Sequence, residues 1–150
     1  MRAAAERLGL DVEIRRFPST TRTAVDAARE IGCELGQIIK SLVFLVDGDP
    51  VLVLCAGTDR VDEAKLRALS GATTVRRATA SEARDITGYP IGGVPPFALA
   101  RSLRVLLDRA LLRHETLWAG AGTGETVIRI RSGDLARASG GTVVDVAAET

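Results

Sequence analysis

The chain has 150 residues, 46% of them hydrophobic and 26% charged, which fits one soluble globular domain and leaves too little chain for two full cores. Its 20 basic and 19 acidic side chains give a net charge of +1, which excludes a broad basic surface that binds DNA or long RNA through many phosphates. With two cysteines and no long apolar stretch, we expect a cytoplasmic protein without a disulfide scaffold or a membrane span.

The N-terminal part predicts two helices around one strand. Residues 1–10 are rich in Ala, Glu, Arg and Leu and predict a helix, and residues 12–17 alternate apolar and polar side chains as a half-buried strand does. Thr23 and Asp26 have the spacing of a capping pair, and apolar residues at helical spacing then extend the second helix up to Gly36.

The centre of the chain predicts a buried β-hairpin. Residues 42–46 and 51–55 are apolar at nearly every position, and the turn between them contains Asp47-Gly48. Because the two runs do not alternate, we expect both faces of this hairpin to be covered.

The rest of the chain predicts short helices and strands in irregular order. Helices are expected at residues 61–69, 79–87, where Thr79 and Glu82 form a capping box, and 132–138, where Ser132 is the cap. Strands are expected at residues 73–77, 103–108, 116–119, 127–130 and 142–146. We therefore predict a mixed α/β (α+β) fold, one domain over residues 1–150, with a central, mostly antiparallel mixed sheet of about seven strands surrounded by helices.

Lys40 is the leading candidate for a functional side chain. The chain uses arginine for 18 of its 20 bases, and Lys40 lies at the mouth of the apolar hairpin, where an ammonium is costly to bury unless it meets an anion or a cavity. The alternative is a lysine at a strand end whose ammonium reaches water. The other lysine, Lys65, is expected on the solvated face of a helix.

Two glycine-containing loops are further candidates. Residues 88–97 hold three prolines and three glycines, and backbone amides fixed in such a loop can orient a carbonyl or a phosphate, although a plain connector is the commoner role. Residues 120–124 lack the Lys-Ser/Thr ending of a phosphate-binding loop and read as a hairpin turn.

Other reactive side chains are weaker candidates. The 22-residue spacing of Cys33 and Cys55 and the distant, single His114 give neither a metal-binding pattern nor a catalytic triad. Cys55 is expected in the core, and Asp108 at the end of an apolar strand either pairs with an arginine or lines a site.

Taken together, these segments resemble the YbaK and prolyl-tRNA-synthetase-associated editing domain family, from about Phe17 to Val146. The resemblance rests on four stretches in order: Thr23-Ala24 with the following Ala-rich helix, residues 36–44, residues 61–66 and, above all, residues 87–97.

The resemblance implies a trans-acting hydrolase for the ester of a misacylated tRNA, with no cofactor and no metal. Lys40, Gly92 and Gly93 correspond to the functional lysine and glycine loop, and substrate contacts are implied for Thr21, Thr23, Phe44, Val94, Pro95, Pro96, Asp108, Gly122 and Thr123. A positioned water, or the thiol of a cysteinyl substrate, performs the attack in this family. The loop together with Phe44 is expected to select the amino acid by size.

The implied partners are the aminoacyl-tRNA acceptor end and prolyl-tRNA synthetase, with no DNA and no membrane. A small amino acid such as Cys, Ala or Ser on the tRNA for proline is the expected substrate. Many relatives have Gly after the loop's Phe, where this chain has Ala98, whose methyl could narrow the pocket or restrict the backbone. The alternative function is a catalytically silent domain of the same fold that binds tRNA ends, nucleotides or a synthetase.

Overall fold

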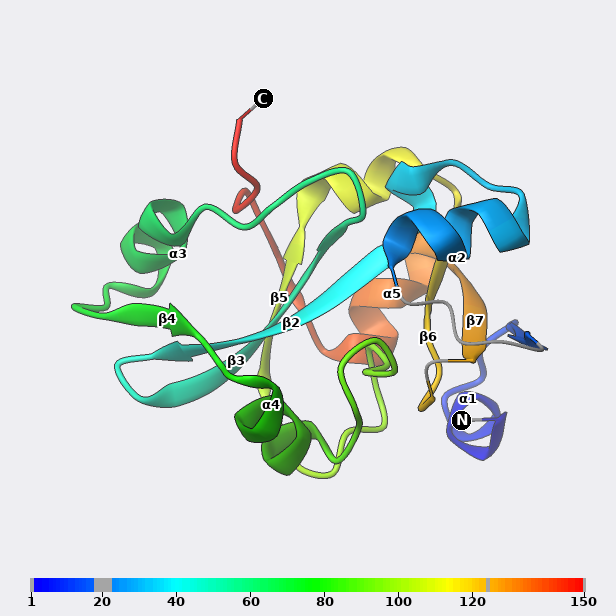
Figure 1. The fold of residues 1–150 in the computed structure, drawn as a ribbon, viewed down its shortest axis with the longest axis horizontal. Coiled ribbons are helices and arrows are strands. Elements are labelled where there is room, and N and C mark those ends of the chain that lie inside the picture. The colour runs from blue at the N-terminus through cyan, green and yellow to red at the C-terminus, as the bar shows by residue number, and fades with distance from the viewer. Residues whose placement is uncertain (1, 18–22, 124, 150) are drawn as a thin grey trace.

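Two β-sheets form the centre of the fold (Figure 1). The computed structural model describes residues 2–17, 23–123 and 125–149. One sheet has three strands in the order β1-β7-β6, and the other has five strands in the order β4-β2-β3-β5-β8. The strands are β1 (Glu13–Arg16), β2 (Ile39–Val46), β3 (Asp49–Ala56), β4 (Val75–Arg77), β5 (Arg104–Asp108), β6 (Thr116–Gly120), β7 (Thr126–Arg131) and β8 (Thr142–Val144).

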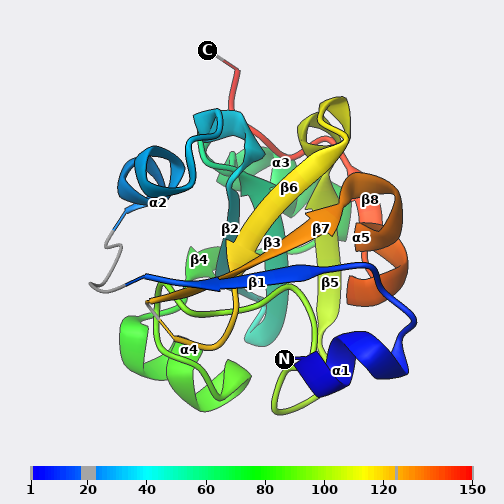
Figure 2. The same cartoon turned by 90° about the vertical axis from the view of Figure 1, so that its right-hand side faces the viewer.

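Short helices surround the two sheets (Figure 2). They are the α-helices α1 (Arg2–Arg7), α2 (Ala24–Ile31), α3 (Glu63–Ser70), α4 (Ala80–Thr87) and α5 (Ser132–Ser139), with 3-10 turns η1 (Leu35–Gln37) and η2 (Arg109–Arg113). All five α-helices are short, so their stability comes from packing against the sheets rather than from helix propensity.

The mixed α+β class is confirmed, but the prediction of one central sheet of about seven strands is wrong. Eight strands in the described residues form two sheets, and the three-stranded sheet lies in front of the five-stranded one in Figure 2. The reason is the apolar hairpin β2-β3, which needs cover on both faces. The three-stranded sheet covers one face, and α3 with the C-terminal segment covers the other.

The predicted hairpin is confirmed and is longer than expected. Asp47 (φ 49°) and Gly48 (φ 85°) form its turn with positive φ at both central positions, as a type I′ turn requires. Residue pairs run from Val46 opposite Asp49 to Ile39 opposite Ala56, so Lys40, opposite Cys55, lies within β2 one pair from the open end of the hairpin.

The side chains of β2 alternate between two hydrophobic clusters. Ile39 and Val43 pack in the cluster between the two sheets, whereas Phe44 and Val46 pack in the cluster that includes Leu66 of α3. Lys40 is therefore on the α3 face of β2, and Ser41 is on the face that looks toward the three-stranded sheet.

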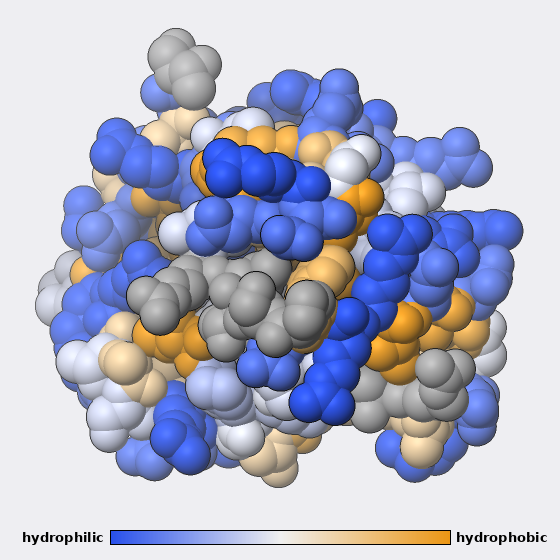
Figure 3. Space-filling view, turned by 45° about the vertical axis from the view of Figure 1, so that its right-hand side comes forward, coloured by the Kyte–Doolittle hydropathy of each residue, from blue (hydrophilic) through white to orange (hydrophobic). Residues whose placement is uncertain are grey.

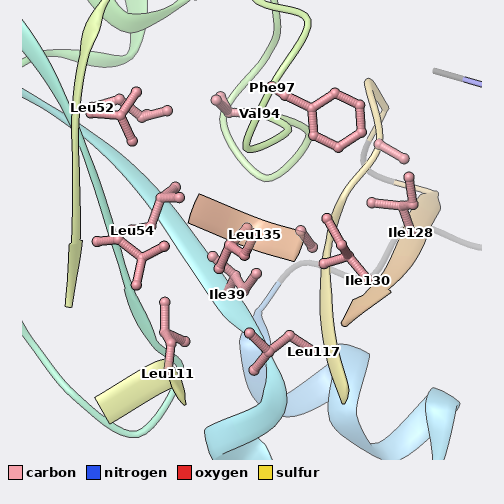
Figure 4. Packing of buried hydrophobic residues seen from close by; sticks show 14 of the residues in the cluster. Ile39, Leu52, Leu54, Val94, Phe97, Leu111, Leu117, Ile128, Ile130 and Leu135 are labelled. Carbon is pink, nitrogen blue, oxygen red and sulfur yellow. The ribbon is translucent and has the colours of Figure 1, made fainter. Parts of the chain in front are cut away.

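The main core fills the space between the sheets (Figure 4). Side chains of both sheets point toward one another there, with Leu135 of α5 among them and Val94 and Phe97 of the loop after α4 at one end. Val94 and Phe97 are almost fully buried, so the glycine- and proline-rich loop is anchored in the core by its own side chains.

Some helix ends lie where the sequence predicts them and others do not. Thr23 caps α2 by accepting a hydrogen bond from the N–H of Asp26 (3.1 Å), as predicted. However, α2 ends at Ile31 because Gly32, with φ 81°, closes it well before Gly36. Ser132 is the first residue of α5 and not its cap, since Arg131 holds the cap position.

A pH-dependent contribution to stability arises at the start of α4. Glu82 accepts hydrogen bonds from Arg76 Nη1 and Nη2 (both 2.8 Å) and from the N–H of Thr79 (2.9 Å). The Arg76 guanidinium first, and then the Thr79 amide, lower the pKa of Glu82 from 4.5 to about 2. The carboxylate thus stabilises the fold above pH 4.5, and this contribution is lost as the pH falls toward 2.

Glu82→Gln tests this contribution, because glutamine keeps a capping oxygen but not the charge. We expect the variant to have a lower Tm than the wild type at pH 7, and the two Tm values to converge as the pH approaches 2. Thermal unfolding followed by circular dichroism between pH 2 and pH 7 measures both. A Tm difference that stays constant over this range would contradict the ion pair.

The surface carries small hydrophobic patches separated by hydrophilic residues on the face shown in Figure 3. The exposed large hydrophobic residues come from different elements: Leu8, Val25, Leu69, Ile91, Leu112 and Val143. Among the described residues, no helix is long and apolar enough to cross a membrane.

Candidate functional site

A cavity of about 250 Å³ lies along the free edge of β2; we call it the edge cavity. β4 pairs with β2 only at Phe44, Leu45 and Val46, and β6 approaches β2 at the bridge between Ile38 and Trp118. The stretch of β2 between these contacts is open, and the cavity fills the gap. Its remaining walls come from α2, the segment from β4 to α4, the loop after α4 and strands β6 and β7.

The lining of the edge cavity is mostly apolar. Alanine, valine and isoleucine side chains and Trp118 supply most of it, and the polar side chains in the lining are those of Thr23, Lys40, Ser41 and Arg77. No carboxylate, histidine or thiol is in this lining, so the described residues offer the cavity two cations and two hydroxyls but no conventional base or nucleophile.

Lys40 stands at the boundary of the edge cavity. Its ammonium donates a hydrogen bond to the backbone carbonyl of Asp59 in the loop after β3, and the side chain is half-buried. Within the described residues no carboxylate lies within ion-pair distance of it. One backbone carbonyl leaves the positive charge uncompensated, so Lys40 can still attract an anion or a developing oxyanion.

Ser41 brings an unused hydroxyl to the same cavity. Its Oγ is buried and has no hydrogen-bond partner in the described part of the chain. A buried hydroxyl without a partner costs about 1–3 kcal/mol of folding free energy. A ligand that bonded to Ser41 would recover part of that cost.

The loop after α4 presents backbone amides to the edge cavity. Gly92 and Val94 are in its lining, whereas Gly93, Pro95 and Pro96 are buried behind it. The two prolines have no N–H, and the N–H of Gly93 already donates to the carbonyl of Pro90 (2.9 Å). The N–H groups of Gly92 and Val94 therefore remain as the loop's donors for a ligand, because neither has an acceptor among the described residues.

The described part of the predicted hairpin turn, residues 120–123, supports this loop from behind. The N–H of Gly122 donates to the carbonyl of Gly93 (2.9 Å), and a Cβ on Gly93 would lie 3.0 Å from backbone atoms of Thr123. A Cβ on Gly120 would likewise lie 3.1 Å from the carbonyl oxygen of Gly92. Glycine at these positions lets the two loops touch backbone to backbone, which fixes the position of the Gly92 and Val94 amides.

Gly93→Ala tests that contact. Thr123 opposes the added methyl group with backbone atoms, so we expect the loop to shift and the free energy of unfolding to fall by about 1–3 kcal/mol. Gly133→Ala is the matched control, because its Cβ would meet nothing within 4 Å and alanine favours helix α5. Urea unfolding measures both variants. Equal stability of Gly93→Ala and wild type would show that the loops are not in tight contact.

Ala98, at the position where the family resemblance implies glycine, is exposed and does not line the edge cavity. Its φ of 60° lies in the left-handed region that glycine adopts without strain, and Tyr89 Oη donates a hydrogen bond to its carbonyl (2.6 Å). The methyl group therefore does not narrow the cavity; it strains the backbone of the loop instead.

The structure brings together four of the predicted site residues and separates others. Thr23, Lys40, Gly92 and Val94 line the edge cavity, although the Thr23 hydroxyl is used as the α2 cap. The buried Gly93, Pro95 and Pro96 and the turn residues Gly122 and Thr123 lie outside the lining. Thr21 lies outside the described residues.

Phe44 does not bound the edge cavity, which corrects the expectation that it selects the amino acid. It is on the α3 face of β2, 4% exposed, and packs against Leu66. The reason is strand alternation: the uniformly apolar sequence of β2 hides which residues share a face.

Asp108 is also placed away from the edge cavity, and it forms no ion pair with an arginine of the described residues. It is 1% exposed, and its two oxygens accept hydrogen bonds from the N–H groups of Ala110 (3.1 Å), Val146 (2.9 Å) and Ala147 (3.1 Å). The carboxylate thereby ties the C-terminal segment to the end of β5.

The cysteines and the histidine have ordinary surroundings. Burial raises the pKa of Cys55 to about 11, so its thiol is protonated at neutral pH and is not a nucleophile. His114 forms a 3.7 Å pair with Glu34 and is not in the cavity lining. Across the described ranges, no group of three or more His, Cys, Asp or Glu side chains is placed to hold a metal ion.

Sequence reasoning missed Ser41, Arg77 and the small residues around them. Ser41 was not among the candidates, but alternation along β2 places it on the face opposite to that of Lys40, and it is in the cavity lining. Arg77 has a visible signal too, since it is the last residue of the predicted strand 73–77 and pairs with Phe44 of β2.

The family of the chain follows from its match to a family model. The model of the aminoacyl-tRNA editing domain matches residues 18–138. The chain belongs to this family. It thus shares its fold with domains that edit aminoacyl-tRNAs, and the edge cavity is the hollow in which Lys40 meets the glycine loop.

Relatives of this editing domain occur alone and inside synthetases. The uncharacterized protein YwhH of Bacillus subtilis is 34% identical over 85% of this chain and 81% of its own length. The proline-tRNA ligase of Maridesulfovibrio salexigens is 35% identical over 71% of this chain, which spans only 18% of that enzyme. A crystal structure described as a candidate trans-editing enzyme for prolyl-tRNA synthetase is 37% identical, with a TM-score of 0.91 over 99% of this chain and 94% of its own.

Proposed function

We propose that this editing domain hydrolyses, in trans, the ester that joins a wrong amino acid to the terminal adenosine of a tRNA. The observation that carries the proposal is the edge cavity, where an apolar lining meets Lys40, a buried free hydroxyl and two backbone amides. The similarity to a proline-tRNA ligase and to a candidate prolyl-tRNA trans-editing enzyme makes the tRNA for proline the first to test.

Hydrolysis of this ester needs no side-chain nucleophile. Water adds to the ester carbonyl carbon and the carbonyl oxygen becomes an oxyanion. The bond to the ribose oxygen then breaks, and the proton lost by the water goes to that ribose oxygen, which releases the amino acid and the tRNA. The N–H groups of Gly92 and Val94 and the ammonium of Lys40 are the donors that would stabilise the oxyanion. Holding the ester and a water next to these donors supplies the remaining acceleration.

The shape of the cavity favours a small amino acid. At about 250 Å³ it must hold the aminoacyl group and the ester, and its walls are apolar apart from Thr23, Lys40, Ser41 and Arg77. Alanine and cysteine need no strong hydrogen-bond partner, and serine could bond to the free hydroxyl of Ser41. We therefore propose alanyl-, cysteinyl- or seryl-tRNA as the substrate class.

Ser41→Ala tests the role of the free hydroxyl. If Ser41 bonds to the bound substrate, the variant loses about three- to tenfold in kcat/KM, while its free energy of unfolding stays equal or rises because an unpartnered buried hydroxyl is removed. Deacylation rates and urea unfolding check both effects. Full activity in Ser41→Ala would exclude a contact between this hydroxyl and the substrate.

A panel of charged tRNAs tests the proposed function itself. Alanyl-, cysteinyl- and seryl-tRNA for proline are incubated with the protein, with correctly charged prolyl-tRNA as the control. We expect hydrolysis of at least one mischarged species above the rate in buffer and none of prolyl-tRNA. Binding without hydrolysis would instead identify a silent module that holds tRNA ends.

A further inference from the structure

A second hollow of about 660 Å³ adjoins the edge cavity on the α3 face of β2; we call it the basic cleft. Its lining includes Lys40, Leu42 and Arg77, which also line the edge cavity, so the two hollows share a wall. The register of β4 on β2 explains this, since Arg77 lies opposite Phe44 and shares its face. Arg60, in the loop before α3, lines the basic cleft but not the edge cavity.

The three cations of the basic cleft lack carboxylate partners. None of Lys40, Arg60 and Arg77 forms an ion pair with another of the described residues. By contrast, Arg76, the neighbour of Arg77 on the other face of β4, is bound bidentately by Glu82. Three unpaired positive charges around one hollow raise the local potential in a chain whose net charge is only +1.

The cleft also contains two acidic side chains and an apolar floor. The carboxylate of Asp62 caps α3: it accepts hydrogen bonds from the N–H groups of Ala64 (2.9 Å) and Lys65 (3.2 Å), which stabilise its negative charge. Glu63 is exposed, and its carboxylate accepts no hydrogen bond from the described residues, so it would repel a bound anion. Leu42, Phe44 and Val61 supply an apolar surface beside the cations.

We infer that the basic cleft binds the phosphodiester backbone of the single-stranded 3′ end of the tRNA, and that Arg60 and Arg77 are its phosphate contacts. The inference rests on the proposed function and completes it: the substrate is an aminoacyl ester joined to a chain of negatively charged phosphates, and the protein offers a mostly apolar cavity joined to a cationic cleft. The ester then lies at the shared wall, beside Lys40.

The probe is the uncharged trinucleotide CCA, the common 3′ end of tRNAs, with adenosine as a ligand that carries no phosphate. Binding is followed by NMR titration of the wild type, Arg60→Gln, Arg77→Gln and Glu63→Gln. Arg101→Gln is the matched control, because Arg101 is exposed and lines neither hollow. Amide spectra of the free proteins establish that every variant is folded.

We expect Arg60→Gln and Arg77→Gln each to weaken CCA binding about three- to tenfold and to reduce the slope of log K against log salt by about 0.7. Glu63→Gln should tighten binding, and adenosine should bind all variants alike. Arginine variants that bind CCA as tightly as Arg101→Gln, or that lose adenosine binding equally, would overturn the inference. Because CCA carries no aminoacyl ester, normal CCA binding without deacylation would overturn only the proposed function.

Discussion

Lys40→Ala is expected to lower kcat/KM for deacylation by about 100-fold or more while leaving the fold intact. A donor aimed at the developing oxyanion typically contributes about 10²–10³ in rate. Lys40 is half-buried at the wall of the edge cavity, and its only hydrogen bond in the described residues is to the Asp59 carbonyl. Its removal therefore breaks no ion pair and should change stability little.

Lys65→Ala is the control that the sequence itself provides, since it removes the only other lysine. Lys65 donates to the Ala147 carbonyl (2.8 Å) and pairs with Asp145 (3.3 Å), away from both hollows. It should reduce stability slightly and leave kcat/KM unchanged. Lys40→Arg tests the need for a compact ammonium and should restore only part of the activity. Comparable activity of Lys40→Ala and Lys65→Ala would remove Lys40 from the mechanism.

Asp108→Ala is expected to have the largest effect on stability of any substitution considered. The change leaves three N–H groups without their acceptor, the buried one of Val146 and the part-buried ones of Ala110 and Ala147. An N–H group without an acceptor costs about 1–3 kcal/mol, and water that enters the space reduces this cost. We therefore expect the free energy of unfolding to fall by about 3–5 kcal/mol. Urea unfolding at 25 °C measures it.

Asp108→Asn separates this structural role from a contact with the substrate. The amide keeps one oxygen that can accept from Val146 and Ala147, so we expect about half of the stability loss. If Asp108 only holds the C-terminal segment, the folded Asn variant deacylates at nearly the wild-type rate. A stable Asn variant with strongly reduced activity would return Asp108 to the site that the family resemblance implied.

Local signals in the sequence predicted most elements of the fold. The Asp47-Gly48 turn, the Thr79 and Glu82 capping box and the Thr23 cap are all read from neighbouring residues, and all three are present. The division of the strands into two sheets could not be read in this way. It depends on which strand covers β2, and the contact between Ile38 and Trp118 spans most of the chain.

The candidate site was predictable where family motifs marked it and not where it depends on faces and distant contacts. The motifs singled out Lys40 and the glycine loop as candidates, and Ala98 adopts the positive φ that favours the glycine which the resemblance implies there. Phe44 was placed on the wrong face and Ser41 was not singled out, because an apolar strand does not reveal its two faces. Asp108 was misjudged because its partners Val146 and Ala147 lie 38 and 39 residues further along the chain.

Single-turnover deacylation with the protein in excess over mischarged tRNA for proline tests the central claim most directly. The protein should hydrolyse alanyl-, cysteinyl- or seryl-tRNA faster than buffer, spare prolyl-tRNA, and lose this activity in Lys40→Ala but not in Lys65→Ala. Decay of all three mischarged tRNAs at the rate in buffer, with a folded wild-type protein, would contradict the account.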